Sequence, residues 1–170
     1  NTAVGYEAGH DISTGRYNTI VGAEAGDKIT TGDSNMLFGY AAGSAITEGA
    51  RNVAIGGAAL STATTQNYNT AVGHGALSTA ASGENVAVGY NAGAATSSSG
   101  SNTYVGYQAG LSNTTGQNTA VGQNALLSNT TGTGNTAVGI KAMDANVDGD
   151  NNVAIGEGAL SNMDPSGNVD

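Results

Sequence analysis

The five residues Asn135-Thr136-Ala137-Val138-Gly139 are one copy of a unit that recurs along the whole chain. Aligning the copies on their Asn gives ten anchor residues at spacings of 16 or 17 residues, and a truncated eleventh anchor at Asn168. The ten anchors are Asn1, Asn18, Asn35, Asn52, Asn69, Asn85, Asn102, Asn118, Asn135 and Asn152. A fixed period of this kind indicates a repeat architecture, in which each unit buries its surface against its neighbours.

Two columns of the aligned repeat hold a fixed kind of side chain. The seventh residue after each anchor is always Ala, from Ala8 to Ala159. The third residue after each anchor is large and apolar, and we expect this column to form the structural core. Its members are Val4, Val21, Phe38, Ile55, Val72, Val88, Val105, Val121, Val138 and Ile155.

Each unit opens with a short β-prone run such as Thr70-Ala71-Val72, closes it with Gly, and continues into turn residues such as Ser112–Gly116. A unit of this length is too short for a helix pair and shows no 3.6-residue apolar stripe. The pattern therefore predicts an all-β fold, a parallel β-solenoid of about ten coils of 16 or 17 residues, in a single domain spanning residues 1–170. At roughly 4.8 Å per coil the rod would be on the order of 50 Å long.

The alternating pleat of each strand gives it two faces. The second residue after the anchor is mostly Ala, with Ile20, Leu37 and Tyr104 as larger members, and we expect this column to allow identical chains to approach closely. A narrow coil buries little area against the entropy of ordering its chain, so association is expected, with cyclic symmetry. The anchors fit two interpretations, a ladder of stacked amides or a left-handed turn residue.

Composition excludes several classes of partner. The net charge of −9 and a pI of about 4.2 make nucleic acid and anionic lipid surfaces repulsive. No apolar run is long enough to cross a bilayer, so no direct membrane insertion is expected. The absence of Cys excludes disulfides and thiolate metal sites.

Two groups of motifs carry a resemblance to known families. Asn52-Val53-Ala54-Ile55-Gly56 and Asn152-Val153-Ala154-Ile155-Gly156 resemble the head repeats of trimeric autotransporter adhesins. Gly106-Tyr107-Gln108-Ala109-Gly110 and Asn135-Thr136-Ala137-Val138-Gly139 resemble the repeats of phage-type tail fibres. The resemblance implies a left-handed β-roll, a homotrimer and an extracellular location on a virion tail fibre or a bacterial cell surface. The chain begins inside a repeat, so we expect it to be a segment of a longer fibre.

The chain offers little for catalysis. His10 and His74 are the only groups that titrate near neutral pH, and they occupy different columns four coils apart. We therefore expect no enzyme activity. The best metal candidate is the run of oxygen donors Asp144, Asn146, Asp148 and Asp150, which matches the opening of a calcium loop. The match fails at Ile155, where such a loop needs Glu, so ordinary turn chemistry explains these residues better and no cofactor is expected.

Two further columns suggest binding surfaces. Tyr6, Tyr40, Tyr90 and Tyr107 follow the strand-closing Gly, where they could either stack on a cell-surface glycan or receptor or seal contacts between chains. The first residue after the anchor is often Thr, and a flat column of Thr could bind ice. Met36, Val53, Val86 and Val153 interrupt it, which favours a position facing the core.

These observations predict a structural fibre segment that displays surface for host or cell attachment, without catalysis. The alternative is an ion- or ice-binding β-solenoid. Replacing Val72 or Val121 by Asp is expected to collapse neighbouring coils if that column is the core.

Overall fold

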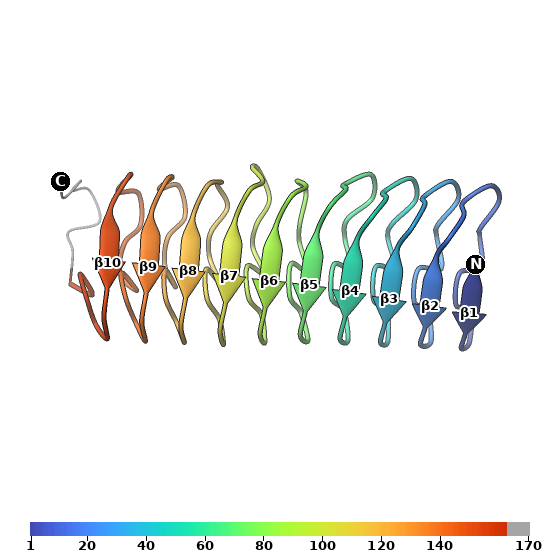
Figure 1. Ribbon diagram of the computed structural model, residues 1–170, viewed down its shortest axis with the longest axis horizontal. Coiled ribbons are helices and arrows are strands. Elements are labelled where there is room, and N and C mark those ends of the chain that lie inside the picture. The colour runs from blue at the N-terminus through green and yellow to red at the C-terminus, as the bar shows by residue number, and fades with distance from the viewer. Residues whose placement is uncertain (163–170) are drawn as a thin grey trace.

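The computed structural model describes residues 1–162, which form one parallel β-solenoid (Figure 1). Each coil, the stretch from one anchor to the next, contributes one strand, and the strands pair in chain order into a single sheet. They are β1 (Thr2–Val4), β2 (Thr19–Val21), β3 (Met36–Phe38), β4 (Val53–Ile55), β5 (Thr70–Val72), β6 (Val86–Val88), β7 (Thr103–Val105), β8 (Thr119–Val121), β9 (Thr136–Val138) and β10 (Val153–Ile155). The predicted all-β solenoid is confirmed, and Asn168 lies outside the described residues.

Neighbouring strands are in register although the repeat length varies. Thr70 of β5 pairs with Val86 of β6 across a spacing of 16 residues, and Thr136 of β9 pairs with Val153 of β10 across 17. The strand-closing Gly sets the distance between coils, as Gly73 shows with a φ of 133°. A Cβ on Gly73 would lie 2.6 Å from the carbonyl carbon of Gly89 in the next coil, so only Gly allows this stacking.

The interior of the coil is lined by the middle residue of each strand and by the Ala column. From β2 to β10 every middle residue is buried, and large and small side chains compensate for each other. In one coil the large Tyr104 ring packs against Gly110, where an added Cβ would overlap the ring. In the coil that has the small Ala71 in its strand, the position equivalent to Gly110 is the large Leu77. The interior is therefore narrow, and the middle strand position and the position eight after the anchor together hold one large side chain at most levels.

A polar column replaces apolar side chains in the later coils. Eleven residues after the anchor the interior residue is Ile29 and Ile46 in early coils but Asn in three later ones. Asn146 Nδ2 donates to Asn129 Oδ1 at 2.8 Å, and Asn129 Nδ2 donates to Asn113 Oδ1 at 2.5 Å. Asn113 Nδ2 donates in turn to the hydroxyl of Tyr104. This chain of hydrogen bonds satisfies the amides in the dry interior.

The anchors form an unbroken amide ladder. From Asn18 to Asn152 the backbone N–H of each anchor donates to the Oδ1 of the preceding anchor. The anchor side chains also reach the turn of the coil, as in the donation from Asn52 Nδ2 to the Gln66 carbonyl at 2.8 Å. The ladder interpretation is confirmed. The left-handed residue is the one before each anchor, for example Tyr68 with a φ of 62°.

Candidate functional site

The outer face of the β-sheet is formed by the first and third residues of the ten strands, and we call it the sheet face. These residues are partly or fully exposed, while the middle residues point inward. The structure corrects the expectation that the third column forms the core of the chain. Its members are Val4, Val21, Phe38, Ile55, Val72, Val88, Val105, Val121, Val138 and Ile155, all on the sheet face.

The physical reason for this correction is the width of the coil. The interior is filled by the middle strand residues packed against the Ala column, which leaves no room for a branched side chain at every level. The mostly small middle column is therefore the interior of the chain. The expectation that it meets identical chains is corrected as well, because residues such as Ala71 and Ala120 are fully buried.

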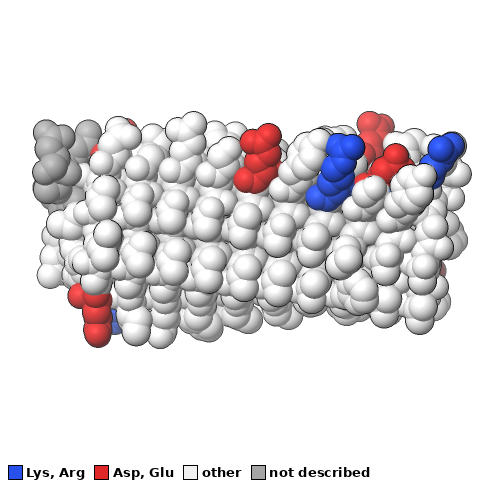
Figure 2. All heavy atoms as spheres, in the orientation of Figure 1, with Lys and Arg blue, Asp and Glu red and all other residues white. Residues whose placement is uncertain are grey.

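The sheet face is regular and uncharged, and its third column is entirely apolar. Ile55 is 38% exposed, and Val88 and Val105 are each 37% exposed, in the middle of the rod where neighbouring coils already shield them. None of the ten strands in residues 1–162 contains a charged residue. Figure 2 shows charged side chains along the upper edge and at the left end of the lower edge, with a broad uncharged band between them. A continuous apolar stripe of this length is a mark of an interaction surface.

The Thr column also lies on the sheet face. Thr70, Thr103 and Thr119 are half-buried, and Met36 and Val86 are exposed. The expectation that this column faces the core is wrong, because alternation places it beside the outward third column. Thr and Val therefore form two parallel columns on one surface.

The Tyr column lies at the edge of the sheet that follows the strand ends, which we call the strand-end edge. Tyr6, Tyr40, Tyr90 and Tyr107 are exposed on the single chain. His74, Tyr90 and Tyr107 form a stack on three successive coils, with centroid distances of 5.7 Å and 5.4 Å. The sequence showed the shared column but not that His74 belongs to the stack. The column adjoins the sheet face, because each member lies two residues after the third residue of a strand.

The two histidines are not brought together. His10 Nδ1 lies 2.7 Å from Asp11 Oδ1, and this hydrogen bond raises the pKa of His10. His74 lies four coils away in the ring stack. In the described residues they form no shared site.

The four calcium candidates do not converge either. Asn146 points into the interior, where it bonds Asn129, so it cannot share a cation with Asp144 and Asp148 on the surface. Asp150 Oδ1 accepts the backbone N–H of Thr133 at 2.6 Å. Within residues 1–162 no cluster of three His, Cys, Asp or Glu side chains is placed to hold a metal ion.

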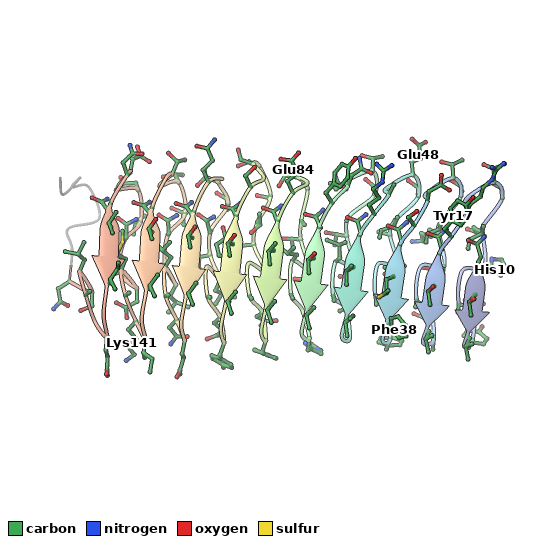
Figure 3. All side chains as sticks on the ribbon, in the orientation of Figure 1. His10, Tyr17, Phe38, Glu48, Glu84 and Lys141 are labelled. Atoms are coloured by element: carbon green, nitrogen blue, oxygen red, sulfur yellow. The ribbon has the colours of Figure 1, made fainter. Side chains whose placement is uncertain are left out.

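The opposite edge is formed by the turns that precede the anchors, and we call it the turn edge. Figure 3 shows Glu48 and Glu84 pointing away from the rod at this edge, whereas Lys141 lies at the strand-end edge. Asp33 Oδ1 accepts the backbone N–H of Arg16 at 2.6 Å, so this carboxylate holds two turns together. The side chains here are the most varied in the repeat.

No protein-family model, curated protein or solved structure matches this chain. In the described part of the chain no helix is long and apolar enough to cross a membrane. The sheet face and the two edges are therefore the features from which a function is inferred.

Proposed function

We propose that the chain is a segment of an extracellular fibre, a phage-type tail fibre or a trimeric adhesin, that assembles as a left-handed homotrimer and displays its edges for attachment to a cell surface. The sheet face is the contact between the three chains, and the turn edge and strand-end edge carry the variable side chains. The proposal requires no catalytic group.

The observation that carries the proposal is the uncharged apolar stripe of the sheet face. Each copy has a net charge of −9, so copies repel except across a surface free of charge. The sheet face is such a surface, and it runs along all ten strands. Water is expelled from Val, Ile and Phe side chains when copies meet there, which favours association.

Cyclic symmetry suits a repeat of this kind. Copies arranged around an axis parallel to the rod place each coil beside its equivalents at the same height, so Val88 meets Val88 and Val105 meets Val105. The Tyr column adjoins this contact, and the ring stack of His74, Tyr90 and Tyr107 would then border the seam between chains. Attachment would result from many weak contacts repeated along three chains.

The molar mass of the native chain, measured by light scattering across a dilution series, is expected to equal three chains. Val88→Asp combined with Val105→Asp is expected to lower the mass to one chain, because six carboxylates would face one another in the seam. The matched control is Ser97→Asp combined with Thr131→Asp, which adds the same charge at exposed turn residues. The control is expected to keep the mass of three chains. A native monomer, or a trimer that the sheet-face variant leaves intact, contradicts the proposal.

Ice binding is the second candidate function, and the outward position of the Thr column favours it. Thr103 and Val105 lie on the same surface and repeat at the coil spacing of roughly 4.8 Å, which gives a flat array of methyl and hydroxyl groups. This function needs the sheet face to be open to water, so it requires a monomer.

The growth rate of single ice crystals in the presence of the chain distinguishes the two functions. An ice-binding monomer is expected to slow growth and shape the crystals, and Thr103→Lys with Thr119→Lys is expected to abolish both effects. Thr131→Lys, at an exposed turn, is the control. The trimer proposal expects no effect of the native chain on ice growth.

A further inference from the structure

Between the ten anchors of the described residues, two turns on the turn edge are one residue shorter than the others. In these two coils the turn between the interior residue eleven after the anchor and the next anchor has four residues, 81–84 in one and 114–117 in the other. The turns 64–68 and 97–101 have five residues each. The strands on either side stay in register, since Thr70 pairs with Val86 and Thr103 with Thr119. The missing residue is therefore absorbed entirely at the turn edge.

Each short turn leaves a hollow between its longer neighbours. The hollow over 81–84 has a volume of about 510 Å³, with residues 65–68 on one side and Gly100 and Ser101 on the other. The hollow over 114–117 has a volume of about 380 Å³ and shares Gly100 and Ser101 with the first. The two hollows thus lie on either side of the ridge that Gly100 and Ser101 form, and we call them together the turn-edge groove.

An aromatic ring is held in place at one wall of the first hollow. Tyr68 is 52% exposed, and its hydroxyl accepts a hydrogen bond from Arg51 Nη1 at 2.6 Å. The guanidinium carbon of Arg51 lies 5.4 Å from the ring centroid, a cation–π contact that fixes the ring orientation. The ring therefore offers an ordered apolar surface, and a ligand that binds to it loses little free energy to the ordering of this side chain.

Polar groups complete the lining of the groove. Glu84 Oε2 accepts a hydrogen bond from Ser101 Oγ at 3.3 Å, which places the carboxylate beside the ridge. Asn67 Oδ1 accepts the backbone N–H of Ala50 at 2.6 Å, so its amide nitrogen is the atom left for a ligand. Gln117 and Thr133 supply an amide and a hydroxyl in the second hollow.

We propose that the turn-edge groove binds a neutral oligosaccharide. Sugars are recognised by an aromatic ring that covers their C–H face together with carboxylates, amides and hydroxyls that bond their hydroxyl groups. Two contiguous hollows fit linked sugar units better than a single one. The carboxylate of Glu84 and the net charge of −9 disfavour acidic sugars. This inference rests on the proposed attachment function and gives it a ligand class and a place.

Saturation-transfer NMR with cellohexaose, mannohexaose and maltohexaose as probes tests the groove. Native chain is expected to transfer magnetisation to at least one of them, and Tyr68→Ala is expected to weaken its affinity about tenfold. Tyr17→Ala is the matched control, because Tyr17 lies in the same column with nearly the same φ, 60°, and lines neither hollow. The control is expected to bind as the native chain does.

A second variant tests the shape of the groove without removing a side chain. Insertion of one Gly between Ser82 and Gly83 restores a five-residue turn and fills the first hollow, so binding is expected to be lost while the far-UV circular dichroism spectrum stays native. The proposal is overturned if the native chain binds none of the three probes, if it prefers sialyllactose or oligogalacturonate, or if both variants bind as well as Tyr17→Ala. Light scattering on the same samples separates this result from the trimer, since a trimer that binds no probe refutes only the groove.

Discussion

A chain that carries Ala120→Asp is expected to be unfolded under conditions in which the native chain is folded. Ala120 is the middle residue of β8, has no exposed surface, and pairs with Tyr104 on one side and Ala137 on the other. A carboxylate there has neither water nor a cation, which costs about 4 kcal/mol or more. Because each coil is stabilised by its neighbours, the damage extends beyond β8. Thermal unfolding followed by far-UV circular dichroism measures it.

The neighbouring substitution Val121→Asp is the matched control. Val121 is half-buried on the sheet face, so its carboxylate keeps contact with water and the coil is expected to fold. The variant chain is expected to be monomeric, because the charge lies in the proposed seam. Collapse of Val121→Asp with a native-like Ala120→Asp would reverse the two faces of the sheet and would falsify the described interior.

A chain that carries Asn52→Leu is expected to lose several kcal/mol of stability although the two side chains have similar shapes. Asn52 Oδ1 accepts the backbone N–H of Asn69 at 3.0 Å, and Asn52 Nδ2 donates to the Gln66 carbonyl. Leu leaves the buried Asn69 N–H without a partner, at about 1–3 kcal/mol, and also removes the donor to the partly buried Gln66 carbonyl. The midpoint of urea unfolding is expected to fall, with an unchanged dependence of the unfolding free energy on urea concentration.

Asn52→Asp provides a control whose stability is expected to change with pH in a defined direction. The ionised carboxylate keeps the acceptor for Asn69 but faces two other oxygen acceptors, the Gln66 carbonyl and Asn35 Oδ1, to which Asn52 Nδ2 donates in the native chain. The pKa of this Asp is therefore raised in the folded chain above its unfolded value. The variant is expected to be closest to native stability below the unfolded pKa and to lose stability as pH rises through the folded pKa. A difference from the native chain that does not vary with pH contradicts the ladder geometry.

The positions and pairing of the strands could be predicted from the repeat alone. A segment such as Thr70–Val72 is β-prone, is closed by Gly73, and recurs at a constant place in every unit, which leaves parallel in-register stacking as the arrangement. The ladder could be predicted only as one of two alternatives. The residue before the anchor, such as Ser34 or Tyr68, takes the left-handed conformation. Ser and Tyr have no strong preference for this conformation, so the sequence did not indicate it.

The face of the strands that points into the coil could not be assigned from the alternation of side chains. Alternation defines two faces of a strand, but it does not say which of them lies inside the coil. Size gave the wrong impression, since the largest apolar column lies outside. A signal was present in the compensation between columns. Ile20 and Leu37 occur where the position eight after the anchor is Gly, and Ala71 occurs where it is Leu77. Residues that exchange volume in this way share an interior.

The candidate sites were predictable to a different degree. The Tyr column is exposed on the single chain, as a binding surface requires, whereas the calcium candidates are separated because Asn146 belongs to the interior column. In the sequence, the turn-edge groove was visible only as two of the three anchor spacings of 16 residues. Its lining comes from five successive coils, which no single stretch of sequence reveals.

The independence of turn length and strand register has a consequence for the gene. Because each unit contacts only its neighbours, a change in the gene that removes or adds a whole repeat keeps the stacking of the rest. At the point of deletion or insertion, each anchor again follows a preceding anchor and each strand again pairs with a strand of the next coil. The product is therefore a shorter or longer rod with intact hydrogen bonding. Small insertions and deletions at the turn edge are tolerated in the same way, as the turns 81–84 and 114–117 show. Such a chain can change its reach and its outer surface rapidly over generations while its interior stays constant.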